Sequence, residues 1–386
     1  MKPGLRNTAI TVALMAALGG GIFYSATDKR ATDQVQATAA IADKRQAQIV
    51  NINGLIALDV EPYFKDVRVI KALEDNNFRV TVTRVGSREM ASKITKDAAP
   101  DFFMPSGVVA GNQIADAAKK AGYTTANYSP FYTPMVIASW TPIAKILAAN
   151  KIAQPSASAG GKDNTYEVDL GKLTDVMLAK KRWRDLPNSS GYDVGRSVLI
   201  STTDVRKSNS AAMYLALTSY VLNGSEVVAS KEKAQKIGLQ VADLFQRQGY
   251  QESYVNGNFD DYVGIGMGKT PLAFTYENQL VTYALTRKTI DKDMVLMYPK
   301  PTIFNKVMVV TLREPAKKFA DLISTDPALQ AIAVEYGFRT NAADALVEAS
   351  AKAGLSIKSR VVDVIDPPSY ETMAEMIEII TQQMKN

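Results

Sequence analysis

Serines beside basic residues are the groups best suited to chemistry in this sequence, because it contains no histidine and no cysteine. Without them, the commonest general base and transition-metal ligand are missing, and thiol catalysis, zinc–thiolate sites and disulfides are excluded. Three serine groups stand where helices are predicted to begin. They are Ser87 with Arg88, Ser106 with Gly107, and Ser208-Asn209-Ser210 after Arg206 and Lys207.

These groups are typical of an anion-binding site. The start of a helix offers unpaired backbone N–H groups and the positive end of the helix macrodipole, and both favour negatively charged atoms. An arginine can add two parallel hydrogen bonds to a carboxylate or phosphate-like group. Each serine can equally be an ordinary N-cap, and Arg88 and Arg206 can be solvated or join an ion pair between two parts of the fold.

Other candidate groups point less clearly to chemistry. Asp59 and Glu61 could serve a cation or acid–base catalysis, but no partner groups accompany them. The segment 264–270, GIGMGKT, resembles a P-loop, yet the pattern requires glycine at Val263. Some aromatic residues could stack on a ligand or lie in the core: Trp140, Trp183, Tyr123, Tyr128 and Tyr132. We therefore predict a binding protein and no enzyme, with no catalytic residue, no metal and no cofactor.

The N-terminus has the pattern of an export signal. Lys2 and Arg6 precede the uncharged run 8–24, TAITVALMAALGGGIFY, which is near the lower length limit for crossing a bilayer. Tyr24 stands where a signal-peptide cleavage site requires a small residue. We expect 1–26 to be an uncleaved signal anchor at the periplasmic face of the inner membrane, the alternative being a cleaved signal peptide. Residues 27–47 are expected to be a helical stalk or a flexible linker.

From about residue 48 the chain alternates β-rich and helical runs, which predicts an α/β fold with mainly parallel strands. Strands are predicted at 49–58, 78–85, 101–104, 198–201, 272–276 and 294–298. Helices are predicted at 67–76, 87–96, 107–120, 210–222, 231–248, 315–336 and 370–384. The Gly-rich segment 154–161 indicates a loop. The net charge of +6 is spread along the chain without a dense basic block, so nucleic acid is not an expected partner.

Seven short motifs follow one another between about residues 48 and 340. They are GSR at 86–88, APDFFMPSG at 99–107, PFYTPMVI at 130–137, STTDVRKSNSAA at 201–212, TPLAFTYENQ at 270–279, YPKPT at 298–302 and KFADLISTDPALQAIAVEYGFR at 318–339. Their order resembles that of the type II periplasmic solute-binding proteins, the venus-flytrap receptors that feed ABC transporters. The molybdate- and sulfate-binding branch is the most similar.

The resemblance implies two α/β lobes joined by crossover strands, with lobe 1 formed by 48–137 plus 296–386 and lobe 2 by 138–295. It implies that the ligand lies between the lobes. It also places Tyr276 and Glu277 at a ligand-facing or hinge position, where Glu277 would suit an amine or hydroxyl or would simply face water. The predicted ligand-binding residues are Ser87, Arg88, Ser106, Gly107, Arg206, Ser208, Asn209, Ser210, Tyr276 and Glu277.

Asp59 and Glu61 depart from the family's pattern, which has an apolar residue followed by Ser-Leu at this loop. Two acids here argue against an anion at this loop. The function implied is still that of an extracytoplasmic solute-binding protein, which captures a small anionic or polar ligand and presents it to a membrane permease. The alternative is a membrane-anchored accessory or sensory protein that keeps the fold without delivering substrate.

Overall fold

The computed structural model describes residues 49–156, 164–251, 256–341 and 343–385. The predicted anchor at 1–26, with its apolar run 8–24, and the predicted stalk at 27–47 lie outside the described residues, as does most of the predicted loop at 154–161. Within the described ranges, every helix is too short or too polar to cross a membrane.

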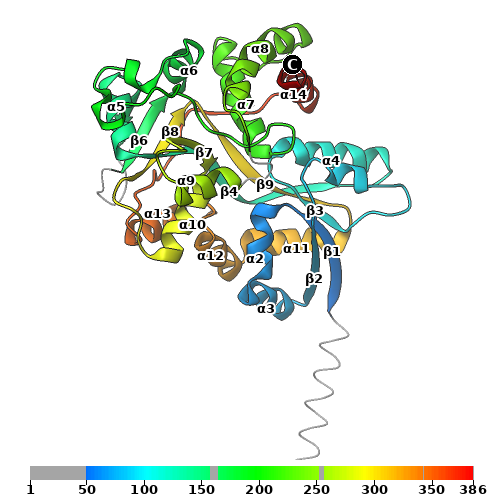
Figure 1. Ribbon diagram of the computed structural model, residues 1–386. Helices are drawn as coiled ribbons and strands as arrows, with labels where there is room; N and C mark the ends of the chain where they lie inside the picture. The colour runs from blue at the N-terminus through cyan, green and yellow to red at the C-terminus, as the bar shows by residue number, and fades with distance from the viewer. Residues whose placement is uncertain (1–48, 157–163, 252–255, 342, 386) are drawn as a thin grey trace, which may run out of the picture. The chain divides into compact units, whose positions relative to one another are not determined.

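The described strands form one hydrogen-bonded network in the order β2-β1-β3-β9-β4-β8-β6-β5, with β7 paired to β4 and β10 to β9 (Figure 1). They are β1 (Val50–Ile56), β2 (Phe78–Arg84), β3 (Phe102–Met104), β4 (Ala126–Trp140), β5 (Ala153–Pro155), β6 (Thr165–Asp169), β7 (Leu272–Tyr276), β8 (Met294–Lys300), β9 (Thr302–Thr311) and β10 (Val364–Ile365). The α/β class is confirmed. The predicted strand at 198–201 is only an isolated bridge, from Ser201 to Ala273.

The prediction of mainly parallel strands is wrong. β1 pairs with β3 and β6 with β8 in parallel, but β4 runs antiparallel to β7, β8 and β9. The first part of β4 pairs with β9, and its second part pairs with β7 and β8. Its register against β9 shifts between Tyr128 and Phe131, around Pro130, which has no N–H to donate. One long crossover strand therefore joins two regions of sheet.

The α-helices of the described residues include five that form near their predicted bounds, two that replace the single predicted helix 315–336, and six that no pattern predicted. They are α2 (Glu61–Lys65), α3 (Val67–Asp75), α4 (Val108–Lys120), α5 (Thr141–Ala149), α6 (Leu170–Leu178), α7 (Asn209–Leu222), α8 (Lys231–Gln246), α9 (Gly257–Gly264), α10 (Glu277–Arg287), α11 (Glu314–Thr325), α12 (Pro327–Glu335), α13 (Ala343–Lys352) and α14 (Tyr370–Lys385). The predicted helix 315–336 is broken before Pro327, where the Asp326 side chain caps α12. The predicted helix 87–96 is wrong, because only the short 3₁₀ helix η2 (Met90–Lys93) forms there.

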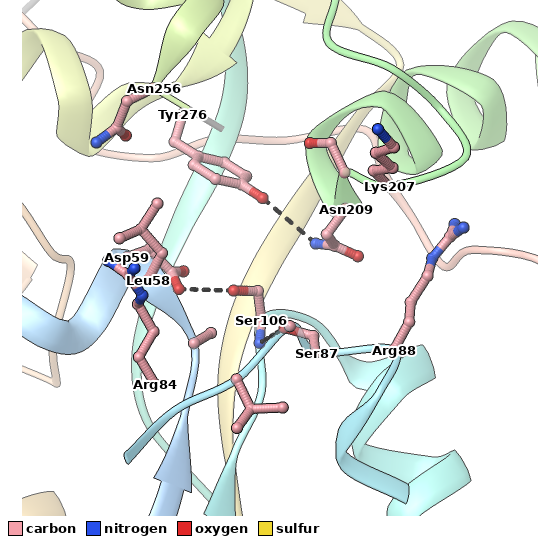
Figure 2. Close-up of a pocket in the computed structure, with 14 residues that line it drawn as sticks. Leu58, Asp59, Arg84, Ser87, Arg88, Ser106, Lys207, Asn209, Asn256 and Tyr276 are labelled. Atoms are coloured by element: carbon pink, nitrogen blue, oxygen red, sulfur yellow. Dashed lines mark hydrogen bonds between the residues drawn. The ribbon is translucent and has the colours of Figure 1, made fainter. Parts of the chain in front are cut away.

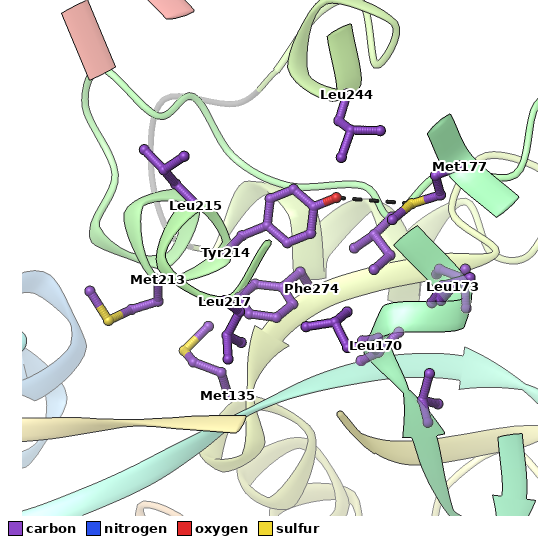
Figure 3. Close-up of a cluster of buried hydrophobic side chains, with 14 of the residues drawn as sticks. Met135, Leu170, Leu173, Met177, Met213, Tyr214, Leu215, Leu217, Leu244 and Phe274 are labelled. Atoms are coloured by element: carbon purple, nitrogen blue, oxygen red, sulfur yellow. Dashed lines mark hydrogen bonds between the residues drawn. The ribbon is translucent and has the colours of Figure 1, made fainter. Parts of the chain in front are cut away.

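A cluster of buried side chains fixes α7 against the second part of β4 and against β7 (Figure 3). Tyr214 of α7 packs edge-on against Phe274 of β7, with ring centroids 5.3 Å apart. Its hydroxyl donates to Met177 Sδ of α6 at 3.9 Å. The start of α7 is therefore held at a defined place relative to the end of β7.

The C-terminal helix α14 packs along α8 (Figure 1). The close approach depends on Gly238 of α8, where an added Cβ would lie 3.2 Å from the side chain of Ile379. The segment 296–386 thus reaches the predicted lobe 2 through α14. The lobe boundaries themselves stay a prediction.

Residues 73–79 form a small compact unit with Val50 and Asn51. Within it, Val50 N donates to Asn77 O at 2.8 Å, and Arg79 Nε lies 3.7 Å from Glu74 Oε1. The pocket described next belongs entirely to the other unit, which contains residues 52–72 and 80–386.

Candidate functional site

A cavity of about 630 Å³ opens where several strands end (Figure 2). Its volume is in the range of small-molecule sites, about 300–1,000 Å³. The walls are formed by the segments after β1, β2, β3 and β7 and by the start of α7. The lining residues are Ala57, Leu58, Asp59, Arg84, Val85, Gly86, Ser87, Arg88, Ser106, Lys207, Ser208, Asn209, Asn256 and Tyr276.

The floor of the pocket is assembled by the parallel pairing of β1 with β3, which aligns Ile56 with Met104. Ser106, just after β3, donates through Oγ to Asp59 Oδ1 at 2.6 Å and through its backbone N to Ser87 Oγ at 3.0 Å. Three segments far apart in the sequence are thereby joined at one point. Ser87 and Ser106, which the sequence predicted as ligand-binding residues, lie together here, and Asp59, which was not in that set, lies beside them.

The opposite wall is formed by Asn209 and Tyr276, whose side chains point toward each other in Figure 2. Asn209 Nδ2 donates to the Tyr276 hydroxyl oxygen at 3.3 Å. Burial, followed by the charge of Asp59, raises the pKa of Tyr276, so its hydroxyl keeps its proton. Gly107 lies close behind this wall: its φ of 85° favours glycine, and an added Cβ would lie 3.2 Å from Asn209 Nδ2.

Basic residues outnumber acids among the residues that line the pocket. Arg84, Arg88 and Lys207 face one acid, Asp59. Arg88 Nη1 donates to the backbone oxygens of Val205 at 3.2 Å and Arg206 at 3.3 Å, and burial lowers the pKa of Arg88. The charge balance favours a ligand with a negative group.

Asp59 is the one acid among the basic and neutral residues that line the pocket. Burial raises its pKa, although hydrogen bonds from Ser106 and Asn305 favour the ionised form. Asn305 Nδ2 lies 3.3 Å from Asp59 Oδ2. Over the described part of the chain no ion pair includes Asp59, and no three acidic side chains gather closely enough to hold a metal ion. Glu61 is not its partner, because Glu61 pairs with Lys65 at 2.8 Å and with Arg84 at 3.2 Å.

Six of the predicted residues line this pocket: Ser87, Arg88, Ser106, Ser208, Asn209 and Tyr276. The helix predicted after Ser87 is absent, so its hydroxyl is presented by a turn. Ser208 is the N-cap residue of α7 but makes no side-chain capping bond; its hydroxyl bonds to that of Ser210 at 2.9 Å. The ordinary N-cap reading of Ser208 is therefore wrong.

Arg206, Ser210 and Glu277 lie outside the lining. Arg206 forms an ion pair with Asp204 at 2.6 Å, and Ser210 bonds to the Thr203 hydroxyl at 2.8 Å. Glu277 is completely buried, and its carboxylate accepts from Arg339 Nε at 2.7 Å and Nη2 at 2.9 Å. We leave these three residues out of the proposed site, because their polar groups are already engaged.

Of the eight lining residues outside the predicted set, four are polar or charged: Asp59, Arg84, Lys207 and Asn256. Asp59 had a usable signal, because it stands just after a predicted strand, as ligand-facing residues do in α/β folds. Lys207 was noted only as a neighbour of Ser208. Arg84 and Asn256 carried no signal: Arg84 ends an alternating strand, and Asn256 precedes a helix that no pattern predicted.

No protein-family model and no curated protein sequence matches the chain. Solved structures do match it. The periplasmic binding protein P5PA is 11% identical, with a TM-score of 0.50 over 86% of this chain and 99% of that one. The chain has the fold of a periplasmic binding protein. The fold that the sequence motifs implied is thereby confirmed.

Two further matches have lower TM-scores than this periplasmic binding protein. The sulfate-binding protein SubI from Mycobacterium tuberculosis H37Rv is 15% identical, with a TM-score of 0.47 over 84% of this chain and 96% of that one. Iron-bound HitA from Pseudomonas aeruginosa is 11% identical, with a TM-score of 0.48 over 87% and 98%. The ligands in these descriptions belong to those proteins.

Proposed function

We propose that this protein is an extracytoplasmic solute-binding protein, which captures a small anionic or polar solute in the pocket of Figure 2 and presents it to a membrane permease. The observation that carries the proposal is the surplus of basic side chains in a cavity built from strand ends. The fold of a periplasmic binding protein supports it. The pocket lining contains no activated nucleophile, so we propose binding without catalysis.

Hydrogen-bond donors in the pocket suit an anion. The Ser87 oxygen accepts from Ser106 N and the Tyr276 oxygen accepts from Asn209, so both hydroxyl protons can turn to a ligand. A guanidinium has five N–H donors, and the two bonds to backbone oxygens use only one nitrogen of Arg88. Arg88 can therefore bind a ligand while the protein holds it in place.

Closure completes the proposed mechanism. Arg88 follows β2, and the carbonyls that it binds precede α7, so one side chain connects opposite walls of the pocket. We place these walls on lobe 1 and lobe 2, with β4 as one crossover strand. A ligand that touches both walls would shift the population toward a closed form, which a permease can recognise. Residues 8–24 would hold the protein at the outer face of the inner membrane.

Replacing Lys207 by glutamine tests this function, because it removes one charge and keeps a polar side chain that is only one atom shorter. We expect the dissociation constants of anions that raise the melting temperature of the full chain to increase about tenfold, or about 1.4 kcal/mol. Isothermal titration with sulfate, phosphate, molybdate and simple carboxylates measures the change. Lys317→Gln, at an exposed Glu314 pair, is the matched control. Equal affinities for the two variants would contradict the proposed site, and no binding at all would favour the accessory role.

A further inference from the structure

The carboxylate of Asp59 is the one acidic group among the described residues that line the pocket. Its two oxygens accept from the Ser106 hydroxyl at 2.6 Å and from Asn305 Nδ2 at 3.3 Å. The backbone N–H groups of Asp59 and Val60 also favour its charged form, and all four of these donors are uncharged. Asp59 is part of the pocket lining, and Figure 2 shows its carboxylate beside Ser106 at the floor. A ligand in the pocket therefore meets an acceptor there, with no cation of the described chain paired to it.

The charges of the pocket are separated across it. Lys207 and Arg88 lie on the side of α7, while Asp59 and Arg84 lie on the other side (Figure 2). The charge of Arg84 is opposed by Glu61, 3.2 Å away. The α7 side is thus positive, and the Asp59 side offers an acceptor with little net positive charge.

A fully deprotonated tetrahedral anion fits this arrangement poorly. At the floor it would bring its own negative charge toward Asp59 without a proton to share, and like charges repel most strongly where water is excluded.

We infer that the natural ligand is a small organic anion that also carries a hydrogen-bond donor, a hydroxyl or an ammonium group. Its anionic group binds Lys207 and Arg88, and its donor binds the carboxylate of Asp59. The inference rests on the proposed function and names the ligand class of the same pocket. It accounts for an acid at a loop where the family resemblance implies none.

Probes that share an anionic group and differ in their hydroxyl or ammonium donors test the inference. We would titrate the full chain with lactate, L-alanine and propionate, and with glycerol 3-phosphate, propyl phosphate and sulfate. The donor-bearing members should bind about tenfold more tightly than propionate, propyl phosphate and sulfate, since a site built for a donor rejects analogues that lack it. Lactate and L-alanine separate the hydroxyl from the ammonium group.

Asp59→Asn isolates the acceptor, because asparagine keeps the shape but removes the charge and one acceptor oxygen. We expect the preference for donor-bearing probes to fall to about threefold or less. Sulfate and propyl phosphate should bind more tightly than they do to the wild type. Glu61→Gln, which removes an acid two residues away and outside the lining, should keep the preference.

Three results are decisive against the inference. Equal or tighter wild-type binding of sulfate or propyl phosphate would overturn it while the proposed function stands. An equal loss for all probes in Asp59→Asn would show a structural role for this side chain. If no probe binds the wild type, the proposed function fails and the inference fails with it.

Discussion

Asp59, which is half-buried at the edge of a cavity, and Glu277, which is completely buried, are two acids that the fold treats in opposite ways. Asp59 accepts hydrogen bonds from the uncharged groups of Ser106 and Asn305 and lines a cavity. Glu277 is completely buried, and Arg339 and the Tyr298 hydroxyl occupy both of its oxygens. The difference shows that a buried carboxylate with its own cation is part of the structure, whereas one without a cation is available to a ligand.

The Glu277 cluster connects distant parts of the chain. Glu277 begins α10, Tyr298 belongs to β8, and Arg339 follows α12. Arg339 also donates to the backbone oxygens of Lys358 and Ser359. Because every member has a partner in the chain, the cluster can stabilise this arrangement, and nothing in it is left for a solute.

The largest expected effect comes from breaking the ion pair of this cluster. Arg339→Met leaves Glu277 buried without its cation, and we expect the free energy of unfolding to fall by about 3–5 kcal/mol. Urea denaturation of the full chain measures it. Adding Glu277→Gln to this variant should recover part of the loss, because the unpaired charge disappears.

The control is Arg313→Met, which removes an arginine that is about half exposed and lies 3.3 Å from Asp101. Asp101 is buried but also accepts two hydrogen bonds from Asn53, and the arginine is solvated, so we expect this pair to contribute about 1 kcal/mol or less. A loss for Arg339→Met no greater than for Arg313→Met would contradict the structural role of the Glu277 cluster.

Asp59→Asn should raise the free energy of unfolding, whereas Arg339→Met lowers it, because Asp59 has no cation as a partner. Burial raises the pKa of Asp59 in the folded protein, so the folded state holds this proton more tightly than the unfolded state does. The contribution of Asp59 to the stability of the wild type should therefore fall as the pH rises above 3.8, the ordinary value. We expect the ligand-free variant to be more stable than the wild type at pH 7 by roughly 1 kcal/mol.

Thermal unfolding of both proteins between pH 3 and 8 checks this prediction. The gap should close as the pH approaches 3.8, because Asp59 is then protonated in both states. A wild type that is more stable than Asp59→Asn at pH 7 would mean that the carboxylate stabilises the fold, and the contrast with Glu277 would disappear.

Local patterns in the sequence predicted about half of the helices and strands of the described chain, and they did not predict the partners of side chains. Tyr276 and Glu277 are neighbours, and only Tyr276 lines the pocket. The reason is Arg339, which engages Glu277 from 62 positions further along the chain. In the same way, the motif around Ser87 led to a residue that lines the pocket, although the helix expected to present it does not form.

Local sequence patterns also could not predict whether neighbouring strands pair parallel or antiparallel. Alternation identifies a strand but is the same for parallel and antiparallel neighbours. The run around Pro130 and Pro134 was recognised as a crossover only through a family resemblance. That β4 pairs antiparallel with β7, β8 and β9 depends on contacts with segments more than a hundred residues away.

The smallest expected effect concerns Glu61, an acid that is paired with cations at the surface. Glu61→Gln removes the ion-pair partner of Lys65 and Arg84. Both cations are largely exposed, so the free energy of unfolding should change by about 0.5 kcal/mol or less. Arg84 lines the pocket, and losing its counter-charge should tighten glycerol 3-phosphate binding about two- to threefold at low salt. Titration with glycerol 3-phosphate at 20 and 300 mM salt measures the change in affinity, and urea denaturation measures the change in stability. The tighter binding should disappear at 300 mM salt, because salt screens the charge of Arg84.

Tighter binding that persists at high salt would show that Glu61 acts through the shape of the loop and not through its charge. A change in stability as large as that of Arg339→Met would contradict the ranking itself. If these predictions hold, Asp59, Glu61 and Glu277 follow one rule. The loss of stability on removing one member of an ion pair grows with the burial of the charge that is left behind. Only Asp59, the acid without a cationic partner, would then contact the ligand.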